Sequence, residues 1–271
     1  MKQFILNSEP DRSGRIRLEG RDYRYLVRVR RLAPGEYFPA LLPDGTGVNV
    51  RVCSVDNRTV VGEIALSGQS PHGASPSEQS PHGANKPLPP IILLQALPKG
   101  EKMDIIVRQA AEGGLAEIVP FVSEFSMVKL SGSGLNGGHK LSRWERIIKE
   151  ARQQSGSTTA TAIRQPLSID GLFAYWEQIA AQRPRALGLL FHHLPLAQTS
   201  LHGYLDSSPE MVALVIGPEG GFSSAEAERF ITAGFKPFTI GDTILRTETA
   251  SLYAQAAVRI LLGEKDSWKT K

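Results

Sequence analysis

After Pro90, apolar residues follow two alternating patterns along the chain. Short, nearly continuous apolar runs predict buried strands at residues 91–94, 117–119, 186–191, 211–216 and 238–240. Between these runs, apolar residues recur every three or four positions, which is typical of helices that cover a sheet. Strands that alternate with helices favour a mostly parallel sheet, so residues 91–271 are predicted to form an α/β domain.

Three of the predicted helices have a defined apolar face. The first turns small or apolar residues inward: Met103, Ile106, Ala110 and Ala111. The second turns inward Trp144, Ile147, Ile148 and Ala151. Its basic residues are therefore expected on the surface: Arg143, Arg146, Lys149 and Arg152. The third begins near Thr249, and its buried side is predicted to be Leu252, Tyr253, Ala256, Ala257 and Ile260.

The first 90 residues divide into two parts. Residues 1–66 alternate short β-rich runs with turn signals such as Pro34-Gly35, which predicts a small antiparallel barrel or sandwich. Residues 67–90 are rich in Ser, Gly, Pro and His, and repeat the hexapeptide Gln-Ser-Pro-His-Gly-Ala. We interpret them as a flexible insertion or linker, in which His72 and His82 reflect a duplication rather than a metal site.

Composition and charge add limits to this picture. With 271 residues, two domains are expected, and the single cysteine, Cys53, excludes an internal disulfide. No signal peptide or membrane span is recognisable, so a cytoplasmic protein is expected. A net charge of +4 permits a polyanionic partner, and five arginines gather between Arg21 and Arg31 with two tyrosines among them. This cluster indicates either RNA binding or the solvated edge of a β-domain.

Two segments run from a predicted strand into a helix through glycine and polar residues. In the first, Gly217-Pro218-Glu219-Gly220-Gly221-Phe222-Ser223, the pair Ser223 and Glu226 forms a capping-box pattern. The second runs from Ile240 to Ser251. Taken singly, each has an ordinary reading: a strand-to-helix turn in the first, and an Arg246–Glu248 ion pair with a helix cap in the second. Together, the two loops could form one pocket at the carboxyl ends of the strands.

The pair His192-His193 ends another predicted strand. It could suggest a metal ligand or a general base, but Asp, Glu or Cys at ligand-like spacing does not accompany it. The sequence alone therefore favours an ordinary strand-end pair.

These loops closely resemble the C-terminal motifs of the RsmE family, the 16S ribosomal RNA uridine N3 methyltransferases of the SPOUT superfamily. The likeness extends to Leu97-Pro98-Lys99-Gly100 and to the helix from Arg143 to Ala151. It also includes Val27-Arg28-Val29-Arg30-Arg31-Leu32, so it covers most of the chain outside residues 67–90. Four positions depart from the family pattern: Gln109, Gly113, Phe125 and Ser157.

The resemblance implies a trefoil-knotted α/β domain, a PUA-like N-terminal β-barrel, a homodimer, and S-adenosylmethionine (SAM) as cofactor without a metal. It implies a 16S ribosomal RNA substrate in the small ribosomal subunit. The implied cofactor residues are Leu190, Gly217, Glu219, Gly220, Ile240, Leu245 and Thr247. We expect RNA contacts from Arg28, Arg30, Arg31, Lys99, Arg143 and Arg152.

Methylation of N3 requires that the uracil lose a proton. Our hypothesis is that Arg246 holds the uracil oxygens or a flanking phosphate, while Glu219 or Glu248 orients this arginine or accepts the proton. Two alternatives remain open. A knotted methyltransferase could act on another base or a ribose, or the chain could be a non-catalytic RNA-binding protein of ribosome assembly.

Overall fold

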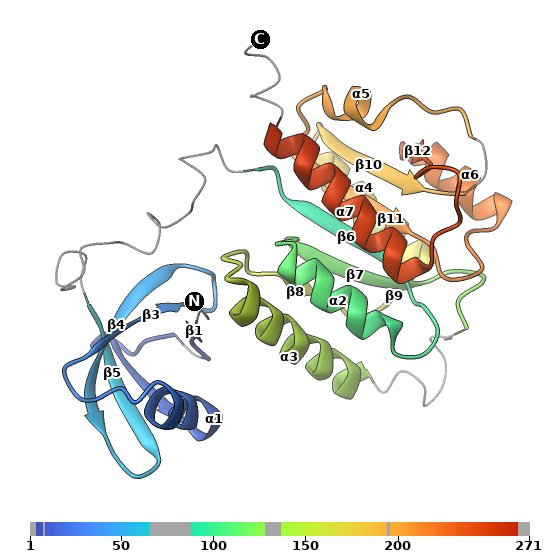
Figure 1. Ribbon diagram of the computed structural model, residues 1–271. Coiled ribbons are helices and arrows are strands. Elements are labelled where there is room, and N and C mark those ends of the chain that lie inside the picture. Colours follow the sequence, from blue (N-terminus) through green and yellow to red (C-terminus); the bar gives the residue numbers. More distant parts are fainter. Residues whose placement is uncertain (1–3, 8, 66–87, 128–136, 194–195, 265–271) are drawn as a thin grey trace. The chain divides into compact units, whose positions relative to one another are not determined.

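The computed structural model describes residues 4–7, 9–65, 88–127, 137–193 and 196–264. The chain forms two compact units, one from residues 1–84 and 152–160, the other from residues 85–151 and 161–271 (Figure 1). Nearly all of the predicted insertion, with His72 and His82, lies outside the described residues. None of the helices in the described part combines the length and apolar content that a bilayer crossing requires.

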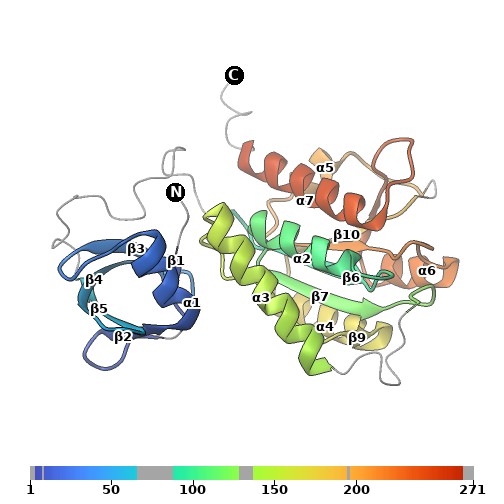
Figure 2. The ribbon, with the colours of Figure 1, turned by 60° about the horizontal axis from the view of Figure 1, so that its bottom comes forward.

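The N-terminal unit contains a five-stranded sheet. Its strands are β1 (Phe4–Ile5), β2 (Arg15–Glu19), β3 (Tyr37–Leu41), β4 (Gly47–Val55) and β5 (Thr59–Ala65), in the order β1-β3-β4-β5-β2. All neighbours are antiparallel except β1 and β3. The sheet curves around its apolar side chains (Figure 2). In β2, Ile16 and Leu18 point inward between exposed charged residues, as alternation in a one-sided sheet requires.

A helical segment between β2 and β3 was not predicted. Helix α1 (Gly20–Tyr23) continues directly into a π-helix, η1 (Arg24–Val29). Within η1 only Leu26 is buried, where it joins the core of the sheet, while Arg28 and Val29 are exposed. Tyr23, Tyr25 and Val27 pack against the same core and are partly buried. The segment is too short for helical periodicity to be recognised in the sequence.

The C-terminal unit is built on a parallel sheet, which confirms the predicted α/β class. Its strands are β6 (Ile91–Ala96), β7 (Glu117–Val122), β8 (Ala162–Ile163), β9 (Leu167–Ser168), β10 (Ala186–Phe191), β11 (Met211–Ile216) and β12 (Lys236–Phe238). The order is β12-β10-β11-β6-β7-β8, and β9 also pairs with β7. Strand β12 ends at Phe238, so Thr239 and Ile240, predicted as strand, belong to the following loop.

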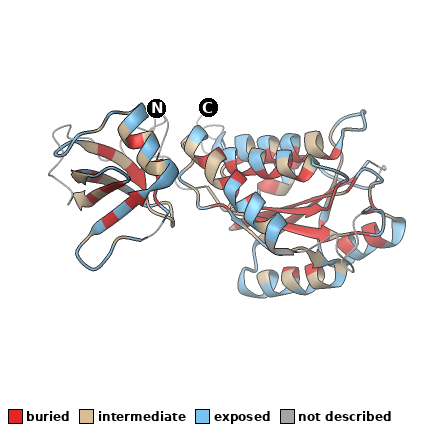
Figure 3. Cartoon of the chain, turned by 90° about the horizontal axis from the view of Figure 1, so that it is seen from below, coloured by how far each residue is buried: buried red, intermediate tan, exposed pale blue. Residues whose placement is uncertain are grey.

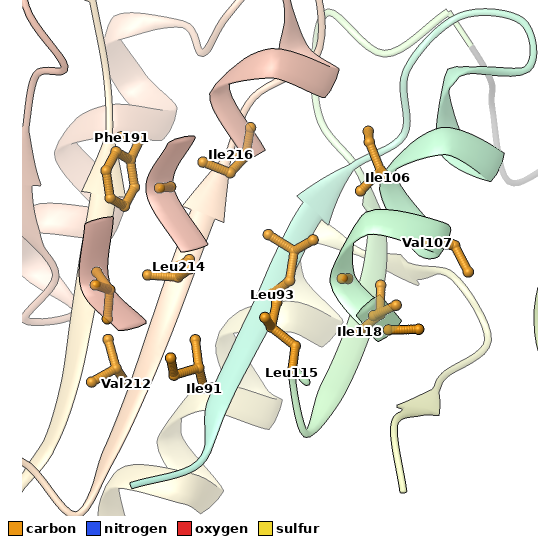
Figure 4. Close-up of a cluster of buried hydrophobic side chains, with 14 of the residues drawn as sticks. Ile91, Leu93, Ile106, Val107, Leu115, Ile118, Phe191, Val212, Leu214 and Ile216 are labelled. Atoms are coloured by element: carbon orange, nitrogen blue, oxygen red, sulfur yellow. The ribbon is translucent and has the colours of Figure 1, made fainter. Parts of the chain in front are cut away.

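Helices cover both faces of this sheet. They are α2 (Lys102–Glu112), α3 (Gly137–Ser155), α4 (Ile169–Gln182), α5 (Leu201–Leu205), α6 (Ser224–Thr232) and α7 (Thr247–Glu264). Alternate strand residues face opposite sides: Leu93 and Leu214 pack with α2 and α7, whereas Leu94 and Val215 pack with α4 and α6. Figure 4 shows the first of these cores, and Figure 3 shows the buried strands between partly exposed helices.

Two predictions about helix faces are wrong. In α7 the buried residues are Thr247, Ser251, Ala254, Gln255, Val258 and Leu262, whereas Leu252, Tyr253, Ala256 and Ile260 are exposed. In α3 the inward face is as predicted, but Arg152 is buried and donates a hydrogen bond to the carbonyl of Thr158 at 3.5 Å. A long side chain at the end of a helix can fold back onto the next turn of chain, which periodicity does not reveal.

The strand order brings three loops together. Strand β11 lies between β10 and β6, and β12 returns to the outer side of β10. All of these strands run in the same direction, so the loops that follow β10, β11 and β12 leave from the same edge of the sheet. In open α/β sheets this edge is where ligands bind.

Candidate cofactor site

A cavity of about 250 Å³ lies where these three loops meet. It is lined by Phe191, His192 and His193 after β10, by residues 216–222 after β11, and by Phe238, Thr239, Ile240, Thr243, Ile244, Leu245, Thr247 and Ala250 around the loop from β12 to α7. The lining thus combines apolar side chains with glycine backbone. The volume is slightly below the roughly 300–1,000 Å³ typical of ligand sites.

The loop after β11 is held in place by glycine geometry and by a helix cap. Gly221 has a φ of 69°, which disfavours any other residue, and a Cβ at Gly220 would lie 2.9 Å from Cβ of Phe125. The predicted capping box of α6 is present: Ser223 Oγ accepts from the Glu226 amide, and Glu226 accepts from the Ser223 amide. The backbone is therefore fixed close to the cavity.

A buried glutamine joins this loop to the start of α7. Gln95, at the end of β6, has a fully buried side chain whose Nε2 donates to Thr247 Oγ1 at 3.1 Å. The same Nε2 lies 3.5 Å from the carbonyl of Gly217. Thr247 Oγ1 in turn donates to that carbonyl at 2.6 Å. The two loops expected to form one pocket are thus connected by a short hydrogen-bond network.

A lysine that the sequence analysis did not single out connects both carboxylates of the site. Lys102 Nζ lies 2.7 Å from Glu219 Oε1 and 3.6 Å from Glu248 Oε2. Glu219 also accepts from the Lys99 amide at 3.1 Å. Partial burial raises the pKa of Glu219, but the hydrogen bonds from Lys102 and from the amides of Glu219 and Lys99 outweigh it, so the pKa is lowered. The hydrogen bond to Glu219 raises the pKa of Lys102.

The residues implied for the cofactor lie together, with one exception. Gly217, Glu219, Gly220, Ile240, Leu245 and Thr247 all line the cavity. Leu190 is fully buried on the opposite side of the sheet, in the core with α4 and α6, and its neighbour Phe191 lines the cavity instead. Side chains alternate along β10, so a shift of one residue exchanges the two faces.

The predicted catalytic arginine is not paired with either carboxylate. Arg246 is exposed on the loop before α7 and does not belong to the lining. Within the described residues, the ion pairs of Glu219 and Glu248 go to Lys102, and none joins them to Arg246. The arginine is thus available to a ligand outside the cavity.

The residues predicted to contact RNA are distributed over both units, and all but one reach the surface. Arg28, Arg31, Lys99 and Arg143 are exposed, Arg30 is half-buried and Arg152 is buried. Arg143 forms ion pairs with Glu101 and Asp104, and the latter also accepts from Trp144 Nε1 at 3.1 Å. The guanidinium of Arg143 is therefore partly neutralised.

The structure also gives the histidine pair a place in the site. His192 and His193 both line the cavity, and their rings stack with centroids 5.0 Å apart and 8° between the planes. The sequence showed two histidines at the end of a predicted strand. They were interpreted as an ordinary strand-end pair, because Asp, Glu or Cys at ligand-like spacing does not accompany them.

These residues fit S-adenosylmethionine better than they fit a nucleotide phosphate. Apolar walls and exposed loop backbone suit an adenine ring, whereas the described residues of the lining include no lysine, arginine or Gly-Lys-Ser/Thr turn. Glu219 contributes one carboxylate for a positively charged group. These features suit a cofactor with a flat, uncharged heterocycle.

Comparison with known proteins identifies the class. Residues 84–259 match the family described as the RNA methyltransferase domain. The chain is 33% identical to the ribosomal RNA small subunit methyltransferase E of Synechocystis over 240 residues, covering 88% of this chain and 70% of that protein. It is 27% identical to the protein of the same name from Mycobacterium tuberculosis, covering 97% and 93%.

A solved structure agrees with these relatives. A methyltransferase of Legionella pneumophila in complex with SAM has a TM-score of 0.70 and 27% identity, over 96% of this chain and 97% of that one. The chain therefore belongs to the RNA methyltransferase domain family, and within it to the ribosomal RNA small subunit methyltransferase E group.

Proposed function

We propose that the protein transfers the methyl group of SAM to N3 of a specific uridine, of the uridine 1498 type, in 16S ribosomal RNA of the small ribosomal subunit. The observation that carries the proposal is the cavity. It is formed by the two motifs that resemble the 16S ribosomal RNA uridine N3 methyltransferases, and the relatives are named as small-subunit methyltransferases.

SAM, when bound, supplies an electrophilic methyl group on a sulfonium. In our proposal Gly217, Gly220, Ile240 and Leu245 hold it through backbone and apolar contacts, and Thr247 fixes the loops that carry them. Leu190 contributes only through its backbone, because its side chain faces the opposite core. Glu219 is tied to Lys102, which holds this carboxylate in place.

Arg246 is proposed to bind the uracil oxygens or a flanking phosphate. Its exposure beside the cavity, without an ion pair to Glu219 or Glu248, supports this role. Glu219 and Glu248 pair with Lys102 and not with Arg246. In our proposal, these carboxylates affect the position of the substrate only through Lys102. An Arg246→Ala variant is expected to bind SAM normally and to lose turnover on RNA.

The RNA contacts are proposed on each unit separately. In the N-terminal unit, exposed Arg28 and Arg31 with half-buried Arg30 provide cations near η1, consistent with a PUA-like RNA-binding barrel. In the C-terminal unit, Lys99 and Arg143 are the accessible candidates. Arg152 stays in the proposal only as a support for the end of α3, because it is buried.

The resemblance supports three further proposals: a trefoil knot in the C-terminal unit, a homodimer, and a cytoplasmic location. The insertion of β11 between β10 and β6 is compatible with a threaded chain. The exposed apolar face of α7 supports the homodimer, since such a face is usually covered by a partner.

The proposal is tested by methyl transfer from labelled SAM to small ribosomal subunits that lack the modification, followed by mapping of the product nucleoside. We expect a single 3-methyluridine in 16S ribosomal RNA. A Gly220→Val variant is the control that should lose activity, because a Cβ there would lie 2.9 Å from Cβ of Phe125 and would shift the loop that lines the cavity. Methylation of another base or a ribose would contradict the target, and SAM binding without transfer would indicate a non-catalytic RNA-binding protein.

A further inference from the structure

The cavity offers few groups that could accept a proton. Among the described residues of its lining, the titratable side chains are Glu219, His192 and His193. Transfer to N3 of a uracil, which is the function proposed above and on which this inference rests, requires one such group or water near the reacting nitrogen. The environment of each side chain decides between them.

Glu219 is poorly suited to accept a proton. Its carboxylate already accepts hydrogen bonds from Lys102 Nζ at 2.7 Å and from the Lys99 amide at 3.1 Å. These bonds stabilise the ionised form and lower the pKa, and a weaker base removes a proton less readily. Glu248 lies outside the lining and also pairs with Lys102. Glu219 is therefore the only one of these two carboxylates that lines the cavity, and its hydrogen bonds favour its ionised form.

The histidine pair consists of one exposed ring and one buried ring. His193 is exposed, and its ring edge packs on the glycine loop: Cε1 would lie 3.1 Å from a Cβ at Gly221. His192 is buried beneath it, and its pKa is lowered by this burial and by the charge of His193. The two rings are stacked, and the outer ring of His193 is the one that solvent and substrate can reach.

We propose that the imidazole of His193 accepts the proton that leaves N3 of the target uracil, with His192 as the neutral ring that supports it. The N3–H bond breaks and its proton passes to a ring nitrogen of His193. The N3 electron pair forms the bond to the methyl carbon, while the methyl–sulfur bond breaks and its electron pair stays on sulfur. The imidazolium then releases its proton to solvent.

The charges around the pair come from three segments. His192 precedes His193 directly after β10, and Glu219 belongs to the loop after β11. Asp242 and Arg246 lie between β12 and α7, and Glu248 lies in the first turn of α7. Of these, only Glu219 shares the lining with the pair, and Lys102 neutralises it. In this proposal the pH dependence of the reaction therefore depends on the imidazole of His193 and not on a carboxylate.

The test is single-turnover methyl transfer across pH 5–9 by the wild type, His193→Asn and His193→Ala, with RNA and SAM saturating. Because protonated imidazole cannot accept a proton, the wild-type rate should rise with pH and reach a plateau. His193→Asn should be about 100-fold slower at the pH of the wild-type plateau, as expected for loss of a general base. Its rate should show no plateau and should rise throughout the range, because the uracil then loses its proton to water or hydroxide. Added imidazole should partly restore His193→Ala.

Affinity for S-adenosylhomocysteine, measured by calorimetry, should change less than threefold in both variants, which separates proton transfer from cofactor binding. His202→Asn, on α5 away from the cavity, is the matched control and should behave as the wild type. An unchanged rate and pH profile in His193→Asn would overturn the acceptor role while leaving the proposed function intact. An inactive wild type would overturn the proposed function and this inference with it.

Discussion

Two buried glutamines, Gln95 and Gln255, differ in how their amides are partnered. Nε2 of Gln95 donates to Thr247 and to backbone carbonyls, whereas both amide atoms of Gln255 lack a hydrogen-bond partner among the described residues. We expect Gln95→Met to destabilise the fold by about 1–3 kcal/mol and to weaken SAM binding roughly tenfold, because Thr247 and the Gly217 carbonyl lose their donor. Urea unfolding and calorimetry measure both effects.

Gln255→Met is the matched control. Replacing an unpartnered buried amide with an apolar group of similar shape is expected to be neutral or stabilising. Gly113 is one of the positions that depart from the RsmE family pattern. A Cβ at this position would lie 2.8 Å from Oε1 of Gln255, so the glycine makes room for the glutamine. Equal losses of stability and SAM affinity in both variants would show that the hydrogen bonds of Gln95 have no specific effect.

The hydrogen bond from Lys102 is the main cause that lowers the pKa of Glu219. In the wild type the lowered pKa means that this carboxylate contributes stability above its ordinary pKa of about 4.5, and that the contribution is lost as the pH falls through the lower folded value. In Lys102→Met only burial and the amides remain, so we expect the Glu219 pKa to rise. Carboxyl-resonance titration by NMR measures the shift, and an unchanged Glu219 titration would refute the dependence.

Single residues of the site were predictable where a motif fixed the backbone. Gly217, Gly220, Glu219 and Thr247 line one cavity, as expected for two motif loops that meet, and their role in cofactor binding stays a prediction. Lys102 was missed because a lysine at the start of a helix is an ordinary surface residue until a distant loop approaches it. Leu190 was included only because the resemblance implied it. The sequence of β10 offers no check, because an apolar strand has no polar residue to mark which side chains face the cavity.

At the scale of elements, the start of α6 is fixed by its capping box. Ser223 Oγ accepts from the Glu226 amide, and Glu226, itself buried, also accepts from the amide of Glu124 at 2.8 Å. We expect Ser223→Ala to cost about 1 kcal/mol in the free energy of unfolding, and Ser223→Gly only a few tenths. Glu226→Ala should cost more, because two amides lose their acceptor.

Urea unfolding gives all three values, with midpoint and slope fitted together. If Glu226→Ala were milder than Ser223→Ala, the bond to Glu124 would contribute nothing. Both capping residues were recognised from the sequence, since the serine and the glutamate stand three residues apart at a strand-to-helix turn.

The orientation of α7 could not be recognised in this way. The helix carries apolar residues on both sides: Ala254, Val258 and Leu262 inside, and Leu252, Tyr253 and Ile260 outside. The outer residues are larger, so hydrophobicity alone selects the wrong face. Strands β10 and β11, in contrast, were predicted with their observed bounds, because uninterrupted apolar runs have clear ends.

At the scale of the whole molecule, the two-sided apolar character of α7 has a consequence. A helix that is hydrophobic around most of its surface is normally buried on all sides. One side of α7 packs on the sheet and α2, while Leu252, Tyr253 and Ile260 keep 39–56% of their surface exposed. In the proposed homodimer a second copy would cover these side chains.

We therefore expect the 29.5 kDa chain to sediment with about twice its mass, and the double variant Tyr253→Glu, Ile260→Glu to sediment as a monomer. Two carboxylates on this face would have to be desolvated without partners, which costs several kcal/mol and outweighs the apolar contact. Val29→Glu, at an exposed apolar residue of η1, is the matched control and should leave the mass unchanged. A monomeric wild type at micromolar concentration would refute the homodimer, whereas a dimeric double variant would place the interface on another surface.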